Sequence, residues 1–392
     1  MMRPPKHILP VIVISQFCCT SLWFAGNGVI QDLVLTFGLV DSALGHLTSA
    51  IQLGFIAGTL VFAILTIADR FSPSRVFFVS AVLAAVFNLG IIWEENSLVS
   101  ILLLRFMTGF FLAGIYPVGM KIAADYYEKG LGKSLGFLVG ALVVGTAFPH
   151  LLKDLTGDFP WKAVFVFTSS LSVLGGGLML SLVPDGPFRK PCQKVDLSAF
   201  FSVFKNRKFR SAAFGYFGHM WELYTFWAFV PVMLLTYGEL HDSEGLNIPL
   251  WSFLIIGLGG LACVMGGYLA QARGTKKIAS LALLLSCLCC LLSPLSFDLE
   301  SDGLFIAFLL FWGMVVIADS PLFSTLVAES ASPEIKGTAL TIVNSIGYMI
   351  TIVSIQLINT VQAMTDSTSI YLLLAIGPAL GLWVLRERME KG

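Results

Sequence analysis

The sequence predicts an all-α membrane protein with twelve membrane-spanning helices arranged as two six-helix bundles. Three observations lead to this prediction: an apolar composition, a series of long apolar runs, and basic residues that gather in alternate connections. Of the 392 residues, 56% are hydrophobic and only 12% are charged, whereas soluble domains carry about 25% charged residues. So few charges cannot cover a water-facing surface, but a lipid bilayer accepts an apolar exterior.

The apolar runs give the number of spans. A helix needs about 20 mostly apolar residues to cross a bilayer, and six such runs precede a long polar stretch while six follow it. The predicted spans cover residues 8–34, 43–67, 75–93, 98–124, 133–152, 162–183, 211–236, 250–271, 277–297, 303–328, 337–361 and 369–385. We therefore expect an N-terminal bundle over 1–183, a cytoplasmic linker over 184–210 and a C-terminal bundle over 211–392.

The charges give the orientation. Twenty of the 24 Lys and Arg residues lie in alternate connections or near the termini, while acidic residues crowd the opposite connections. Basic residues are retained on the cytoplasmic side of a membrane. This distribution predicts a multi-pass protein of the plasma (inner) membrane with both termini in the cytoplasm.

Two short connections about two hundred residues apart have related sequences, as tandem halves require. The first reads ADRFSPSR over 68–75 and the second reads GGYLAQARGTKK over 266–277. The second resembles the loop pattern of the major facilitator superfamily, although Gln271 and Ala272 replace its Asp-Arg. Three further stretches resemble patterns of the same family: RFMTGFFLAG over 105–114, the turn from Lys129-Gly130 to Gly136, and WKAVF over 161–165.

The resemblance covers the whole chain and implies a secondary transporter that acts as a monomer. It also implies that Asp69, Arg70 and Arg75 form a cytoplasmic gate, and that Arg105 borders the central cavity. The antiporter pattern of the fifth span is only partly present, since no Gly-Pro pair accompanies its glycines. The stretch 113–127 is similar to nitrate- and cyanate-type porters.

Four ionisable residues stand out inside the predicted spans, where a charge costs about 2.5–3.5 kcal/mol on insertion scales and marks a candidate functional site. Arg105, in the fourth span, can hold an anionic solute bidentately or can be a structural arginine bonded to carbonyls of the first span. His219 and Glu222, three residues apart in the seventh span, share a helix face. Together with Asp319 in the tenth span, they are candidate proton carriers.

Two prolines predict interruptions at corresponding places in the two halves, Pro117 in the fourth span and Pro321 in the tenth. A proline inside a span frees backbone groups, which lipid tolerates only beside protein or water. Paired interruptions of this kind point to the transport path.

Amide and aromatic side chains within the spans suit a pocket that grips a solute. The candidate substrate-binding residues, beside Arg105, are Trp23, Asn27, Gln31, Gln52, Tyr116, Tyr224, Trp227, Asn344 and Tyr348. Interhelical packing is the alternative role for each of them.

The leading functional hypothesis is an alternating-access transporter of a small anion or organic acid, by symport or antiport with protons. The second is a proton-coupled exporter of lipophilic or cationic compounds, in which Glu222 and Asp319 bind proton and solute in competition. The third is a non-transporting membrane receptor. The expected partners are thus a small solute, protons and the lipid bilayer, with no nucleic acid.

An enzyme is not expected, because the sequence has no Walker loop, no HExxH and no nucleophile elbow. No cofactor or metal is expected either. The cluster Cys287, Cys289 and Cys290 lies in an apolar run, where packing is the usual role of cysteine.

Overall fold

The computed structural model describes residues 5–40, 42–127, 131–157, 159–189, 203–243, 245–331, 336–365 and 367–386. These residues form helices and connecting turns without any strand. The chain packs as two compact units, Met1–Val195 and Asp196–Gly392, which we call unit 1 and unit 2. Lys129 and Gly130, and residues 190–202 of the expected linker, lie outside the described residues.

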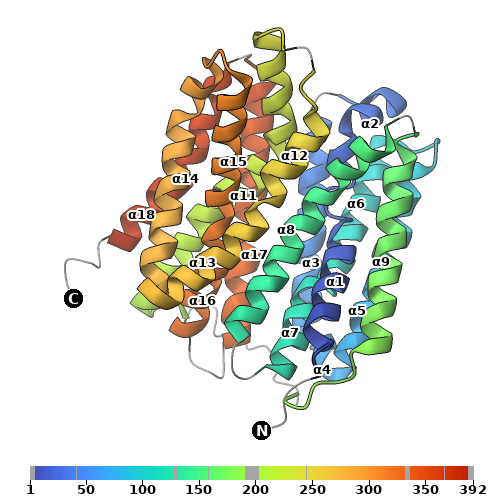
Figure 1. Cartoon of the computed structure of the whole chain (residues 1–392). Helices are drawn as coiled ribbons and strands as arrows, with labels where there is room; N and C mark the ends of the chain where they lie inside the picture. The colour runs from blue at the N-terminus through green and yellow to red at the C-terminus, as the bar shows by residue number, and fades with distance from the viewer. Residues whose placement is uncertain are drawn as a thin grey trace. The chain divides into compact units, whose positions relative to one another are not determined.

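Unit 1 consists of α-helices, which Figure 1 labels, and short 3₁₀ helices (η). They are α1 (Ile8–Thr20), η1 (Asn27–Val29), α2 (Ile30–Phe37), α3 (Ala43–Ile64), α4 (Ile67–Arg70), α5 (Pro73–Leu89), η2 (Gly90–Ile92), α6 (Leu98–Leu112), α7 (Tyr116–Tyr126), α8 (Leu131–Thr156) and α9 (Lys162–Leu182). Those of unit 2 are α11 (Arg207–Leu240), α12 (Ile248–Gly257), α13 (Gly259–Arg273), α14 (Thr275–Phe297), α15 (Asp302–Ala318), α16 (Ser320–Ser330), α17 (Lys336–Gln362), η3 (Thr368–Ala375) and α18 (Ile376–Arg386).

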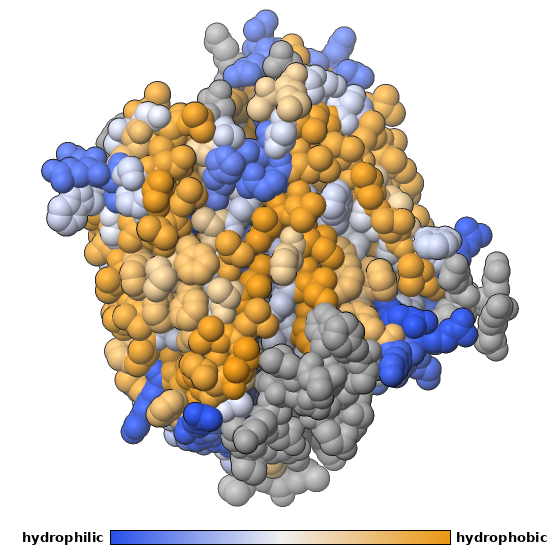
Figure 2. All heavy atoms as spheres, turned by 180° about the vertical axis from the view of Figure 1, so that it is seen from behind, coloured by the Kyte–Doolittle hydropathy of each residue, from blue (hydrophilic) through white to orange (hydrophobic). Residues whose placement is uncertain are grey.

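The described residues contain eleven helical segments long and apolar enough to cross a membrane. Figure 2 shows apolar atoms over much of one face, with hydrophilic atoms gathered toward its two ends. These segments make the chain a multi-pass integral membrane protein, and they match eleven of the predicted spans. The exception is the first span, because α1 has only 13 residues and is too short to cross alone.

The first span differs from the continuous helix predicted over 8–34. Turns occupy residues 21–26, a 3₁₀ turn follows over Asn27–Val29, and α2 resumes at Ile30. The side chain of Arg105, from the fourth span, binds backbone carbonyls of this break.

The fourth and tenth spans are interrupted where the prolines predict it. The fourth divides into α6 and α7 at residues 113–115, and the tenth divides into α15 and α16 at Asp319. In both cases the proline is the second residue of the following helix, a position that needs no backbone N–H donor.

The seventh span is longer than predicted, since α11 runs from Arg207 to Leu240. Asn206 begins this helix, because its side-chain oxygen accepts hydrogen bonds from Lys208 N at 2.8 Å and Phe209 N at 3.4 Å. Such N-caps fix a helix start. The basic residues at 207–210 therefore belong to the first turn of α11 rather than to a polar linker.

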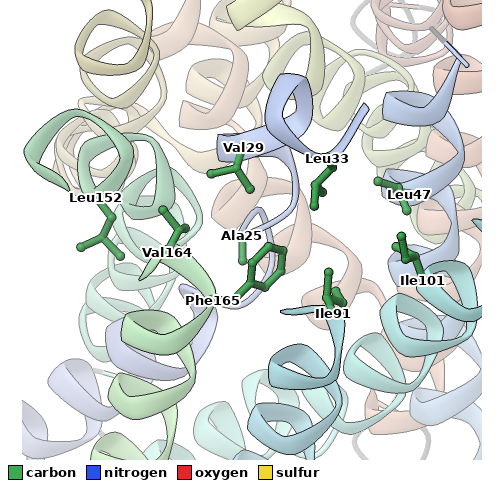
Figure 3. Packing of buried hydrophobic residues seen from close by; sticks show 9 residues of the cluster. All are labelled: Ala25, Val29, Leu33, Leu47, Ile91, Ile101, Leu152, Val164 and Phe165. Carbon is green, nitrogen blue, oxygen red and sulfur yellow. The ribbon is translucent and has the colours of Figure 1, made fainter. Parts of the chain in front are cut away.

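Two features hold unit 1 together. Gly54 of α3 and Gly109 of α6 permit backbone contact, since a Cβ at either position would lie 1.9 Å from a carbonyl oxygen of the other helix. An apolar cluster joins η1 and α2 to the ends of α3, α6, α8 and α9 (Figure 3). Its members are Ala25, Val29, Leu33, Leu47, Ile91, Ile101, Leu152, Val164 and Phe165.

Candidate functional site

Arg105 lies on α6 with its side chain fully buried, and it bonds to the break in the first span. Its Nη1 donates to the carbonyl of Leu22 at 3.1 Å, and its Nη2 donates to the carbonyl of Trp23. These carbonyls follow the C-terminus of α1, where the helix dipole favours a positive charge. The guanidinium thus caps an interrupted helix.

Asn88 of α5 completes this arrangement. Its Oδ1 accepts from Arg105 Nη1 at 3.4 Å, and its Nδ2 donates to the hydroxyls of Thr168 and Ser169 on α9 at 3.2 and 3.0 Å. Among the residues that the structure describes, no carboxylate forms an ion pair with Arg105. These contacts are the ones expected if Arg105 is a structural arginine bonded to carbonyls of the first span.

The other polar candidates of unit 1 are spread over several helices. Asn27 Nδ2 donates to Thr48 Oγ1 on α3 at 2.9 Å, and Gln52 follows Thr48 by one turn on the same face. Trp23 packs against Phe55 with ring centroids 4.9 Å apart. These residues are all buried.

Two further candidates of unit 1 lie apart from this group. Gln31 is exposed on α2, and Tyr116 is half-buried at the first residue of α7.

In unit 2, His219 and Asp319 form a buried pair. His219 Nδ1 on α11 lies 2.8 Å from Asp319 Oδ1, and both side chains are 1% exposed. Asp319 stands at the junction of α15 and α16. The pair therefore joins the seventh span to the break in the tenth.

Glu222 does not share this pair, although it lies on the same helix face as His219. Its Oε1 accepts from Trp312 Nε1 on α15 at 2.6 Å and from Ser286 Oγ on α14. The carboxyl is 1% exposed. Glu222 thus links α11 to α14 and α15. Both hydrogen bonds are accepted by the same carboxyl oxygen, Oε1.

Three aromatic candidates of unit 2 meet at one place. Tyr224 OH and Tyr348 OH lie 2.9 Å apart between α11 and α17, and the rings of Tyr224 and Trp227 pack edge to face at 5.3 Å. Asn344 is half-buried one turn before Tyr348.

Of the residues expected to form a cytoplasmic gate, Asp69 belongs to a charged cluster within unit 1. Asp69 Oδ1 pairs with Lys121 Nζ of α7 at 2.8 Å, while Arg70 and Arg75 are exposed. Arg189 Nη2 donates to the carbonyls of Asp69 and Phe71 at 2.9 and 2.8 Å.

A second set of bonds ties this cluster to the segment after α9. Asp185 accepts from Ser72 Oγ at 2.6 Å and pairs with Arg189 at 2.5 Å. The segment that follows α9 thus lies across the ends of α4 and α5.

Sequence reasoning missed several members of these networks. Asn88, Ser286 and Trp312 bind the predicted ionisable groups, and only the general rule that a buried charge needs a partner could have indicated them. His150, inside α8, is 2% exposed and its Nε2 has no hydrogen-bond partner among the described residues. An isolated histidine in an apolar run was the available signal.

The cysteine cluster of α14 is buried. Within the described part of the chain, no three His, Cys, Asp or Glu side chains are grouped closely enough to hold a metal.

Comparison with known proteins gives three results. A model of the Major Facilitator Superfamily matches residues 12–355. The multidrug transporter MdfA of Edwardsiella ictaluri (strain 93-146) is 26% identical over 264 residues, which are 62% of this chain and 61% of that protein. The uncharacterized transporter YgaY of Escherichia coli O157:H7 is 30% identical over 183 residues, covering 44% of this chain and 45% of the relative.

Among solved structures, a single-residue mutant of the nucleoside transporter NupG superposes with a TM-score of 0.73 at 14% identity. The superposition covers 97% of this chain and 99% of NupG. At this identity the likeness concerns the fold alone. The MdfA match spans about three fifths of the relative's length, so it does not extend over that whole protein.

Proposed function

The chain belongs to the Major Facilitator Superfamily, and from this premise we propose that it is a proton-coupled secondary transporter working by alternating access. In such a cycle the solute site opens first to one side of the membrane and then to the other. The proton gradient drives the cycle when a proton-binding group changes occupancy between the two states.

The observation that carries the proton-coupled part is the contact between His219 and Asp319. Imidazole and carboxyl are the two side-chain groups that most readily exchange protons near neutral pH in a suitable environment. Both are buried in membrane-spanning helices, where an ionisable residue is costly and functional by default. Glu222 is a weaker candidate carrier, because Trp312 and Ser286 already donate to its carboxyl.

For the solute, we infer a lipophilic or cationic compound that is exported. Unit 2 buries two carboxyls, those of Glu222 and Asp319. It also contains the aromatic rings of Tyr224, Trp227 and Tyr348, and ring faces attract cations. The likeness to a multidrug transporter supports the same class. A small organic acid is the second candidate, because Arg105 is a buried cation whose Nε has no hydrogen-bond partner among the described residues.

The sequence alone places the anion first. We prefer the cationic compound because of the hydrogen bonds that Arg105 makes. Both of its terminal nitrogens already bind carbonyls of the first span, so fewer donors remain for an anion. We further propose that its termini are cytoplasmic, as the charge distribution indicates, and that it is a monomer of the inner membrane, as the family resemblance implies.

Proteoliposomes with a trapped pH-sensitive dye test this function. Tetraphenylphosphonium and an aldarate dianion would be added in turn to wild type, Asp319→Asn, Glu222→Gln and Arg105→Lys. Glu329→Gln is the matched control, because Glu329 is an exposed acid on the same helix, α16. We expect proton movement with the cation, lost in Asp319→Asn and kept in Glu222→Gln and Glu329→Gln.

Other outcomes are equally informative. Proton movement with the dianion that disappears in Arg105→Lys would favour the organic-acid candidate. Solute uptake without any proton movement in folded wild-type protein would exclude proton coupling and leave uniport or exchange.

A further inference from the structure

The two sides of the break in the tenth span contact partly different neighbours. At the end of α15, Cys263 Sγ of α13 donates to the carbonyl of Ile317 at 3.5 Å, and a Cβ on Gly266 would lie 3.0 Å from the carbonyl of Ala318. At the start of α16, a Cβ on Gly215 of α11 would lie 2.4 Å from the ring of Phe323. Therefore the end of α15 packs on α13 and the start of α16 packs on α11, while α14 packs against both segments.

Asp319 occupies the N-cap position of α16, yet its side chain does not cap that helix. An N-cap aspartate ordinarily accepts from the second or third backbone N–H of its helix. Here the second residue, Pro321, has no N–H, and the N–H of Leu322 donates to the backbone carbonyl of Asp319 at 3.0 Å. The carboxyl is therefore directed to His219 on the neighbouring helix.

His219 also touches the segment beyond the break, since its ring centroid lies 6.4 Å from that of Phe323. One imidazole thus contacts both the junction residue and the first turn of α16. From this geometry, and resting on the proton-coupled function proposed above, we propose that His219 and Asp319 form a proton-operated lock that sets the angle between α15 and α16. His219 is a positioning residue in this device.

The proton states of the pair decide when the lock is closed. With no added proton, a neutral imidazole faces the carboxylate across the 2.8 Å contact, and with one added proton the two groups form an ion pair. Only a second proton leaves an imidazolium beside an uncharged carboxyl, so the attraction between opposite charges is lost. Doubly protonated protein should therefore have a free joint between α15 and α16.

Other ionisable groups near the pair are few. Glu222 on α11 and Cys263 on α13 interact electrostatically with Asp319, and the ring of Tyr216 on α11 lies 5.9 Å from that of His219. The carboxyl of Glu222 is bonded to Ser286 and Trp312, and Cys263 donates its thiol to Ile317. The lock is thus distinct from the Glu222 contacts.

The break in the fourth span supplies an internal control. It has the same proline at the second position of α7, but its N-cap residue is Ile115, which cannot titrate. A bend controlled by protons should therefore occur in the tenth span and not in the fourth.

The test is a distance measurement between two nitroxide labels in full-length protein, without solute. Non-natural amino acids would carry the labels, because the chain has seven cysteines of its own. One pair replaces Leu304 and Glu329, exposed on α15 and α16, and the control pair replaces Leu103 and Ala124, exposed on α6 and α7. Pulsed electron paramagnetic resonance gives the distance distributions at pH 8 and at pH 5.

We expect the Leu304–Glu329 distribution to broaden or shift at pH 5 while the control pair stays constant. Asp319→Asn and His219→Gln should each give one distribution at both pH values, and Glu222→Gln should behave as wild type. An unchanged wild-type distribution between the two pH values would overturn the lock, and so would a pH response that persists in Asp319→Asn. This wild-type measurement needs no variant to fold.

The result separates the lock from the transport proposal. Proton-coupled transport with a constant α15–α16 distance would remove the lock and keep the function. A pH-dependent distance without proton-coupled transport would keep the lock and remove the function.

Discussion

The two units differ in the charged side chains that they bury most completely. In unit 1, Arg105 is surrounded by backbone carbonyls and an amide, while in unit 2, Asp319 and Glu222 are surrounded by an imidazole, an indole N–H and a hydroxyl. A guanidinium keeps its proton at any ordinary pH, whereas carboxyl and imidazole can change theirs. The contrast teaches that unit 1 has a fixed charge suited to holding structure, and unit 2 has charges suited to switching.

The same contrast appears at the two proline-marked breaks. Ile115 precedes α7 and Asp319 precedes α16, each followed by a proline at the second helical position. Both breaks thus have the same backbone arrangement. Only the break in unit 2 has an ionisable residue at the N-cap position.

The largest expected effect comes from removing the fixed charge. Arg105→Ala would leave the carbonyls of Leu22 and Trp23 without this donor, and each buried acceptor so orphaned costs about 1–3 kcal/mol. We expect a marked loss of thermal stability in detergent. Arg75→Ala, at an exposed position, should stay within about 0.5 kcal/mol of wild type. Normal stability with lost transport would instead make Arg105 a solute ligand and break the comparison.

Next in size is the set of donors around Glu222. Trp312→Phe removes the N–H bonded at 2.6 Å and should cost about 1–3 kcal/mol. Glu222→Gln keeps an acceptor oxygen and should cost less than Trp312→Phe. Thermal unfolding of both variants measures the difference. If Glu222→Gln were the more damaging and also abolished proton movement, Glu222 would join Asp319 as a proton carrier.

A smaller effect is expected from the charge cluster of unit 1. The Lys121–Asp69 pair is partly exposed, with side chains 24% and 27% accessible, and such pairs contribute about 0.2–1 kcal/mol. Asp69→Asn should therefore lower stability slightly, and added salt should reduce the difference from wild type. A large loss of stability would show that this cluster organises unit 1 more than the Arg105 contacts do.

The smallest effect concerns Glu94, which lies outside the spans and pairs with Lys162 at 2.5 Å. The hydrogen bond from Lys162 lowers the pKa of this carboxyl below its ordinary value. A depressed pKa stabilises the fold above the unfolded-state value, and this contribution is lost as pH falls through the depressed value. Glu94→Gln should thus be marginally less stable than wild type at pH 7 and equal to it at acidic pH, as unfolding midpoints would report.

Apolar runs were sufficient to predict the membrane spans, because a span is a local property of about 20 residues. Pro117 and Pro321 also indicated two of the breaks locally. The break of the first span could not be predicted in this way, since its carbonyls are satisfied by Arg105 from the fourth span, 82 and 83 residues away along the chain.

Candidate site residues were predictable by type but not by partner. A charged residue in an apolar run stands out, and His219, Glu222, Asp319 and Arg105 are all buried as that signal implies. The spacing of His219 and Glu222 suggested that they interact, whereas tertiary packing brings Asp319 to His219 and Trp312 to Glu222. The spacing of residues along a helix indicates which of them share a face. It does not indicate which neighbouring helix lies against each part of that face.

The interrupted first span has a consequence for how the chain enters the bilayer during synthesis. At 13 residues, α1 extends roughly 20 Å, which is less than the hydrocarbon thickness of about 30 Å. The turn that follows it presents carbonyls that lipid cannot solvate, and their donor is on the fourth span. The N-terminal segment should therefore remain at the translocation channel, or on a chaperone beside it, until the fourth span emerges.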